Sequence, residues 1–177
     1  MAGSGRDERA WIRGAQSGSV SDLEALFRHH WPRAYRAAYL VVHDSGAAED
    51  IAQEAFLAAL RSLERFDYRR PFGPWLHRIV VNRAIDWSRS RALRPEAAAE
   101  VEQLSAPKRP ETDDAETLAA ALAELSPEHR AVIVMRHLLD YTPGEIAKAL
   151  GLPRGTVNSR LRRGLDDLAG RLGKELR

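Results

Sequence analysis

The stretch LGLPRGTVNSRLRRGL, residues 150–165, holds four arginines within ten residues and no acidic residue. Guanidinium groups bind phosphate oxygens and guanine edges, so these side chains are suited to binding nucleic acid and not to catalysis. Val157 and Leu161 recur at helical spacing, which leaves Gly155, Ser159 and the arginines on the outward face. Small side chains at the start of a helix and arginines further along suit a helix that enters a major groove.

The residues before this helix predict a helix-turn-helix. Thr142 and Glu145 have the spacing of a capping box, and Pro143 stands at the first helical position. Gly151 supplies a left-handed stop, and the second helix follows after a short turn. The alternative is a solvated basic face on an ordinary helical hairpin, because arginine-rich faces alone are common.

Aromatic residues and arginines interleave over residues 66–91, a mixture that stacks unpaired bases and follows their phosphates. They are Phe66, Tyr68, Phe72, Trp75 and Trp87 with Arg69, Arg70, Arg78, Arg83, Arg89 and Arg91. Trp75 lies on the apolar stripe of the helix predicted here and is assigned to the core. Arg83 has Asp86 one turn away as a candidate ion-pair partner. The loop Phe66–Phe72 and the later helical face are therefore the candidate site for single-stranded nucleic acid.

Acidic residues and one leucine share a face of the helix predicted over residues 46–64. Opposite its apolar stripe lie Asp50, Glu54 and Arg61, and Leu57 projects among them. An apolar side chain within an acidic face indicates a protein contact, although a stray exposed leucine gives the same pattern. The acids in residues 44–54 lack the loop spacing of a site for a hard cation, so we predict no metal and no cofactor.

No set of residues suggests an enzyme. The six histidines show no ligand or nucleophile spacing, and cysteine is absent. They are His29, His30, His43, His77, His129 and His137. An apolar content of 44% with 29% charged residues is typical of a folded soluble protein, and no run approaches the roughly 18 apolar residues of a membrane span. The N-terminus has no apolar signal core, so a cytoplasmic protein is expected.

Helices must position these surfaces, because no segment shows the alternating pattern of a strand. Ser21 and Glu24 are spaced as a capping box that opens one helix, and Pro32 is expected to bend or break it. Further helices are predicted over residues 46–64, 72–91, 118–124, 127–139 and 143–150, and after Pro153. Residues 94–116 are rich in proline and poor in large apolar residues, which predicts a flexible linker. The expected fold class is all-α, with two small helical domains.

Three stretches in succession resemble one known family. AEDIAQEAFLAAL, RRPFGPWLHRIVVNRAIDWSR and TPGEIAKALGLPRGTVNSRL are similar to signatures of extracytoplasmic-function (ECF) sigma factors, group IV of the sigma-70 family. Those proteins are initiation subunits, not enzymes, and they confer promoter specificity on bacterial RNA polymerase. The resemblance implies a sigma-2 domain at residues 1–93, which binds core polymerase and recognises and melts the minus-10 element. It also implies a linker at 94–116 and a sigma-4 domain at 117–177, which recognises the minus-35 element.

The resemblance further implies site residues and partners. Asp50, Gln53, Glu54 and Leu57 would face the beta-prime clamp helices of core polymerase. The minus-10 residues would be Phe66, Arg69, Arg70, Phe72, Arg78, Asn82, Arg83, Asp86, Trp87 and Arg89. The minus-35 residues would be Arg154, Gly155, Thr156, Asn158, Ser159, Arg160, Arg162 and Arg163. The implied partners are core RNA polymerase, through its clamp helices and beta flap, promoter DNA and an anti-sigma factor, with no membrane span.

Two residues depart from the family pattern, and one rival class remains at this point. Asn158 stands where the family usually has lysine, and Asp140 replaces the usual glycine before the capping box. Aspartate tolerates a left-handed backbone better than most residues, so the turn is expected to survive. The rival is another DNA-binding regulator, which would sense a ligand or dimerise through residues 1–92 and bind a palindromic site.

Overall fold

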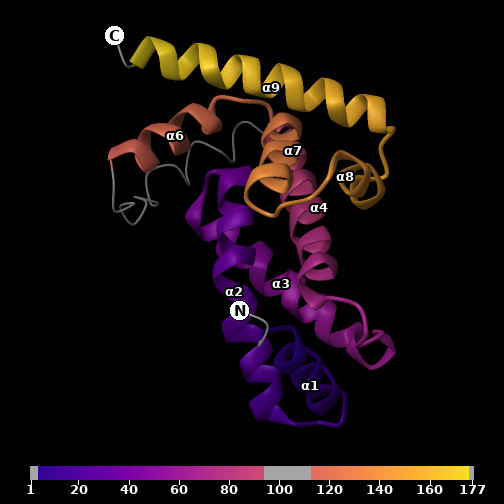
Figure 1. The fold of residues 1–177 in the computed structure, drawn as a ribbon. Helices are drawn as coiled ribbons and strands as arrows, with labels where there is room; N and C mark the ends of the chain where they lie inside the picture. The colour runs from indigo at the N-terminus through magenta and orange to yellow at the C-terminus, as the bar shows by residue number, and fades with distance from the viewer. Residues whose placement is uncertain (1–3, 94–112, 176–177) are drawn as a thin grey trace.

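The computed structural model describes the backbone of residues 4–93 and 113–175, and the side chains of residues 7–93 and 117–173. Within those ranges the regular structure is entirely helical (Figure 1). The all-α prediction is therefore confirmed. Most of the predicted linker, residues 94–112, lies outside the described residues.

The first half of the chain is a bundle centred on one long helix. The helices are α1 (Ser4–Gln16), α2 (Val20–Val42), α3 (Ser45–Ser62) and α4 (Phe72–Ala92), with a 3-10 turn at Leu63–Arg65. Helix α2 packs against α1, α3 and α4. Asp44 starts α3, because its carboxylate accepts a hydrogen bond of 2.9 Å from the Ala47 amide. Buried alanines on α2 and α3 let the helices approach closely, which fixes the faces that remain outside.

Two details of α2 differ from the sequence prediction. The cap is Ser19 and not Ser21, since the Ser19 hydroxyl accepts a hydrogen bond of 3.3 Å from the Asp22 amide. Gly18, with φ of 89°, turns the chain so that Ser19 is the last extended residue before the helix. Pro32 does not break α2. A proline costs about 3 kcal/mol inside a helix, and the packing of α2 on its neighbouring helices offsets that cost.

The described residues of the second half, 113–175, form four helices. They are α6 (Asp113–Ala123), α7 (Pro127–His137), α8 (Pro143–Leu150) and α9 (Arg154–Glu175). Helix α6 begins inside the stretch predicted as linker, so that prediction was too long at its C-terminal end. Helix α9 crosses α7 at Gly164, where a Cβ atom would come within 2.9 Å of the Ile133 side chain. A larger residue at position 164 would therefore require the Ile133 side chain to move.

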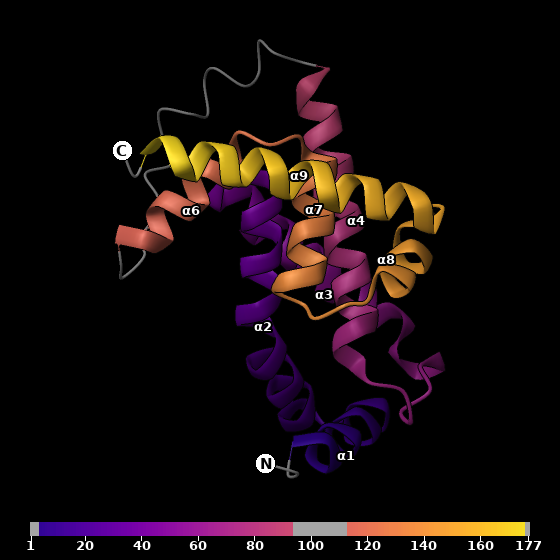
Figure 2. The same cartoon turned by 45° about the horizontal axis from the view of Figure 1, so that its top comes forward.

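The two halves lie against each other. Helix α7 contacts α2 and α4, and α8 contacts α4, while α9 lies at the opposite end of the molecule from α1 (Figures 1 and 2). The buried apolar residues form one cluster that includes members of both halves. Among the described helices, none is long and apolar enough to cross a membrane.

Candidate nucleic-acid and protein interfaces

The helix-turn-helix forms as the sequence predicts. The Thr142 hydroxyl accepts from the Glu145 amide at 3.3 Å, and the Glu145 carboxylate accepts from the Thr142 amide at 2.8 Å. Hydrogen bonds from Thr142 also lower the pKa of the Glu145 carboxyl. Gly151 is left-handed, with φ of 65°, and ends α8. The second helix, α9, then begins at Arg154.

The outward face of α9 is cationic. Its inward side chains Val157 and Leu161 are buried, and the exposed residues of the predicted site are Arg154, Gly155, Asn158, Arg162 and Arg163. Within the described residues, no ion pair engages Arg154, Arg162 or Arg163. The structure therefore leaves their guanidinium groups available to an external anion.

Three other residues of the predicted α9 site are only partly exposed. Thr156, Ser159 and Arg160 are half-buried. The Ser159 hydroxyl donates to the Thr156 carbonyl at 3.1 Å, and Arg160 lies close enough to Glu128 to help lower the pKa of that carboxyl. These side chains border the exposed face and already have interactions within the chain.

A second cationic surface surrounds a cavity of about 520 Å³ at the start of α4. Its lining residues are Ser62, Arg65, Phe66, Asp67, Arg70, Pro71, Pro74, Trp75 and Arg78. The rings of Phe66 and Trp75 stack with centroids 4.6 Å apart and planes 29° apart. The Gln16 amide donates to the carbonyls of Leu63 and Phe66 at 2.9 and 2.8 Å, which fixes the loop to α1. An aromatic stack edged by arginines is suited to an unpaired base and its phosphates.

The structure corrects the expectation for Phe72 and refines that for Trp75, which packs against the core as expected. Phe72 is only 1% exposed, so its ring cannot stack on a base; it packs edge-on against Phe66 and Trp75 with centroids 5.8 and 5.5 Å away. Trp75 was assigned to the core, but it is half-buried and lines the cavity. Arg65 was also missed, because it precedes the loop and its spacing shows no pattern. Arg69 pairs with Asp67 at 3.0 Å on the exposed side of the loop.

The remaining minus-10 candidates lie further along α4. Arg83 pairs with Glu54 of α3 at 2.5 Å and not with Asp86, which is exposed. Helix α3 is the nearer partner because it packs beside α4. Trp87 lies under the Arg91 guanidinium, 5.1 Å from ring centre to cation. The structure therefore brings Phe66, Arg70 and Arg78 together in the cavity, whereas Arg83, Asp86 and Trp87 lie outside it.

Two candidates on α4 contact the second half of the chain. The Asn82 amide donates to the Ala149 carbonyl at 3.3 Å, and Arg89 pairs with Glu128 at 3.1 Å. Neither contact has a signal in the sequence, because each partner is distant along the chain. Both candidates are therefore engaged within the molecule in this conformation.

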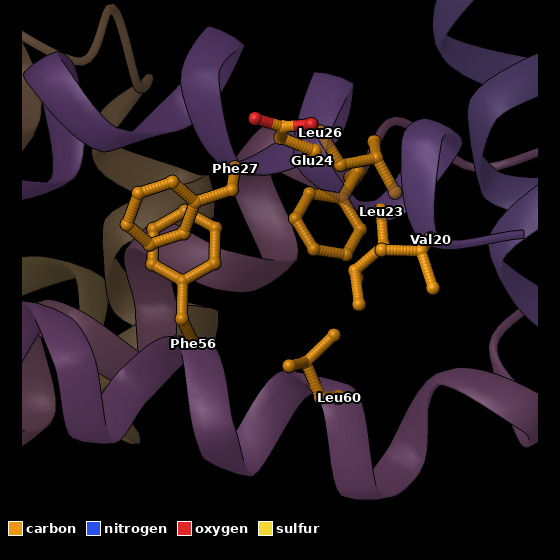
Figure 3. A pocket seen from close by; sticks show the side chains of 8 residues that line it. Val20, Leu23, Glu24, Leu26, Phe27, Phe56 and Leu60 are labelled. Atoms are coloured by element: carbon orange, nitrogen blue, oxygen red, sulfur yellow. The ribbon is translucent and has the colours of Figure 1, made fainter.

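The acidic face of α3 is exposed, as predicted. Asp50, Gln53 and Glu54 point outward, and Leu57 is 51% exposed. Beside this face, α2 and α3 enclose an apolar pocket of about 280 Å³ (Figure 3). In the figure, Val20 and Leu23 face Leu60 across the pocket, and Phe27 lies against Phe56. This pocket has no signal in the sequence, because Val20 and Phe27 belong to a different helix from Leu57.

Two of the six histidines, His30 and His77, are buried between helices. Within the described residues, no three of the histidine, cysteine, aspartate and glutamate side chains come together as a metal site would require. His30 contacts Glu8 at 2.8 Å between α1 and α2. The ring nitrogens of His77 are buried with no hydrogen-bond partner among the described residues, and burial lowers the pKa of His77 to about 4.

A helix-turn-helix with an exposed cationic face, joined to a helical bundle that carries an arginine-edged aromatic cavity, is typical of a DNA-binding protein. Comparison with known proteins places this class within one family. Residues 26–94 match the model of sigma-70 region 2, and residues 115–168 match that of sigma-70 region 4. The chain belongs to the ECF sigma factors of RNA polymerase.

Individual relatives agree with this assignment. The ECF sigma factor SigM of Mycobacterium tuberculosis is 34% identical over 172 residues, covering 96% of this chain and 88% of SigM. SigW of Bacillus subtilis is 31% identical, covering 91% of this chain and 92% of SigW. The structure of CnrH in complex with the cytosolic domain of CnrY matches with a TM-score of 0.67 at 27% identity, covering 95% of this chain and 98% of CnrH.

A further solved structure supports the fold alone. RpoE of Bartonella quintana, in complex with the anti-sigma factor NepR, matches with a TM-score of 0.72 at 22% identity, covering 87% of this chain and 98% of RpoE. Family membership decides against the rival regulator. The protein directs transcription initiation as a sigma factor and is a subunit of an initiation complex, not an enzyme.

Proposed function

We propose that the two halves divide promoter recognition between them. Residues 1–93, the sigma-2 unit, bind core polymerase and recognise and open the minus-10 element, and residues 117–177, the sigma-4 unit, recognise the minus-35 element. The observation that carries this proposal is the arginine-edged cavity with the stacked rings of Phe66 and Trp75. Such a platform suits a protein that holds an unpaired base.

Strand opening follows from the energetics of that cavity. Stacking one base on an aromatic ring contributes about 1–3 kcal/mol, which is comparable to the cost of extruding it from the duplex. Arg65, Arg70 and Arg78 stand around the rings, where they would hold the phosphates of the extruded strand. The cavity thus stabilises the open state over the closed duplex.

The minus-35 element is recognised by the exposed face of α9. Arg154, Arg162 and Arg163 are free to bind phosphates or guanine edges, and Asn158 presents an amide that suits an adenine edge. Asn158 therefore replaces the phosphate contact of the family's lysine with a group able to recognise a base.

Core polymerase binds the face of α3 that carries Asp50, Gln53 and Leu57. The pocket beside it, between α2 and α3, offers Val20 and Phe27 at 76% and 39% exposure. A partner helix can place an apolar side chain there and a basic one against the acids. The beta-prime clamp helices are the proposed partner on this face, and the beta flap is the proposed contact of the sigma-4 unit.

An anti-sigma factor is the proposed regulator. The similar structures of CnrH and RpoE contain the partners CnrY and NepR, and NepR is described as an anti-sigma factor. A partner that covers the Leu57 face and the cationic surfaces would compete with core polymerase. Co-purification from the native host followed by competition tests this idea, and a partner that binds without displacing core polymerase contradicts it.

The decisive experiment for the proposed function is transcription in vitro with core polymerase on a library of promoter sequences. We expect enrichment of a paired minus-35 and minus-10 motif, with unpaired thymines near the minus-10 element in permanganate footprinting. Failure to open any promoter, together with binding of a palindromic duplex as a dimer, would overturn the proposal.

A further inference from the structure

We propose that the free chain inhibits itself: the sigma-4 unit docks on α2 and α4 through an ion-pair latch between Arg33 and Asp140 and masks part of the minus-10 surface. This inference rests on the proposed function of α4. It adds a conformational step, since the latch must open before the promoter can be read.

The latch joins α2 to the turn before the helix-turn-helix. The Arg33 guanidinium pairs with the Asp140 carboxylate at 2.6 Å and donates to the Leu138 carbonyl, with the Nε atom 3.2 Å from that oxygen. Asp140 has φ of 62°, a left-handed conformation that aspartate adopts more readily than most residues. The residue that departs from the family's glycine thus keeps the turn and adds a carboxylate.

A second set of contacts holds the sigma-4 unit against α4. The Tyr141 hydroxyl donates to the Pro74 carbonyl at 2.8 Å, and the Asn82 amide donates to the Ala149 carbonyl at 3.3 Å. Tyr141 is 8% exposed, and burial raises the pKa of its phenol to about 12. Arg89 is occupied by Glu128. Two proposed minus-10 residues, Asn82 and Arg89, are therefore engaged by the sigma-4 unit.

The docked arrangement is incompatible with simultaneous reading of both promoter elements. Elements centred near positions −10 and −35 are about 25 base pairs apart, or about 85 Å at 3.4 Å per base pair. In the structure, α8 of the helix-turn-helix touches α4 through a direct hydrogen bond. The two reading surfaces must therefore separate on the promoter, and the contacts of Arg33, Asn82 and Tyr141 must break.

The seam between the units is built to open. A groove of about 330 Å³ remains between α2, α6, α7 and α9, lined in part by Arg36, Leu40, Leu118 and Leu165. Leu118 and Leu165 are 43% and 38% exposed, so the apolar packing across the seam is incomplete. The latch pair is also partly solvated, with side chains 46% and 79% exposed. Partly exposed ion pairs contribute little stability, which suits a contact that polymerase or DNA must displace.

The test measures the distance between the two units in the full chain. The chain has no cysteine, so labels can be placed at Arg36→Cys of α2 and Leu165→Cys of α9, which are both exposed and both line the groove between the two units. We expect a short distance in the labelled parent and a larger open fraction in Asp140→Gly, which keeps the left-handed turn and removes the carboxylate. The open-to-closed ratio should rise about two- to fivefold in Asp140→Gly. It should rise about tenfold in Arg33→Ala, which also loses the bonds to Leu138.

Two controls make the result specific. Arg28→Ala removes an exposed arginine of the same helix, whose ion pair with Glu24 stays within α2, and it should leave the distance unchanged. The double variant Arg33→Ala with Asp140→Gly should open no further than Arg33→Ala alone, because both changes remove the same contact. Equal distances in the parent and all latch variants would overturn the latch.

Masking is tested with a single-stranded oligonucleotide that carries the non-template minus-10 sequence selected by the wild-type holoenzyme. Its apparent affinity should rise in step with the open fraction, since binding draws only on the competent state. Affinity for a minus-35 duplex should not change, because the exposed face of α9 is free in the docked form. Opening without a gain in oligonucleotide affinity would overturn the masking. If neither the wild type nor any latch variant bound the oligonucleotide, the minus-10 role of α4 would be contradicted instead. The distance measurement tests the docking of the two units and does not depend on that role.

Discussion

The rings of Phe66 and Trp75 stack on each other, with centroids 4.6 Å apart and planes 29° apart. The stack is supported from below by the buried ring of Phe72 and from the side by the hydrogen bonds of Gln16. The loop is thus ordered before DNA arrives, so little conformational entropy is lost when a base is captured.

Replacing Phe66 by leucine together with Arg70 by alanine should slow promoter opening by about 10- to 100-fold, because one base-stacking contribution of about 1–3 kcal/mol is lost. Minus-35 binding should remain unchanged. A template mismatched over the minus-10 region should recover most of the activity. Tyr68→Leu, which removes an aromatic ring outside the cavity, serves as the control in abortive transcription assays.

Phe72→Ala should lower the stability of the fold, and not only the rate of promoter opening. Phe72 is 1% exposed, and removing a buried phenylalanine side chain costs about 3–5 kcal/mol. Urea denaturation monitored by circular dichroism measures this change. A variant that unfolds at the wild-type urea concentration, yet fails to open promoters, would show that Phe72 reaches DNA after all.

Leu57→Asp should weaken binding to core polymerase by at least about tenfold, since an apolar contact in the middle of an interface is replaced by a solvated charge. Helical content should stay the same, because the side chain is 51% exposed. Leu93→Asp, at 83% exposure beyond α4, is the matched control. Equal affinity of the two variants in a core polymerase titration would exclude Leu57 from the interface.

Alanine at both Arg162 and Arg163 should weaken minus-35 binding and flatten its dependence on salt. Each phosphate contact contributes about 0.9 to the slope of log affinity against log salt, so the slope should fall by about 1.8 if both arginines bind phosphates. Fluorescence anisotropy at several salt concentrations gives the slope, with Arg28→Ala as a control. An unchanged slope would mean that these arginines do not face the backbone.

His77 should make the fold sensitive to acid. Burial lowers the pKa of His77 to about 4 from a usual 6.5, with further lowering by His30 and Arg33. Between those pH values the unfolded chain binds a proton that the folded chain does not, so the free energy of unfolding falls as pH drops through this window. The loss should reach about 3 kcal/mol near pH 4, at 1.36 kcal/mol per pKa unit.

The measurement is urea denaturation at several pH values. His77→Leu should flatten the dependence between pH 6.5 and 4, whereas His137→Gln, at an exposed position, should not. An identical pH dependence in wild type and His77→Leu would assign the acid sensitivity to other groups.

Local signals in the sequence predicted most of the helices and the α9 surface. The capping box of Thr142 and Glu145 and the left-handed Gly151 are decided by neighbouring residues, and they form as expected. The Ser19 cap was missed because it depends on the backbone of Gly18, which no spacing rule reveals. At the minus-10 site, apolar periodicity could not distinguish the lining residue Trp75 from the core residue Phe72, since both rings lie near the same stripe.

Contacts between distant segments account for the remaining differences. Arg83 selects Glu54 over the nearby Asp86 because α3 packs beside α4, and sequence spacing favours only the local partner. The docking of Asn82 on Ala149 depends on the arrangement of two units that the sequence joins through a stretch without periodic pattern. Such pairs become visible only when the helices are placed in space.

Because the backbone at Asp140 is left-handed, a mutation to glycine at this position removes the latch without straining the turn. Every aspartate codon becomes a glycine codon by one change at its second base, and glycine fits the same backbone. One point mutation therefore removes the carboxylate that pairs with Arg33 and preserves the helix-turn-helix that follows. A lineage that carries this sigma factor can lose or regain the restraint on its activity in a single mutational step, without passing through a misfolded protein.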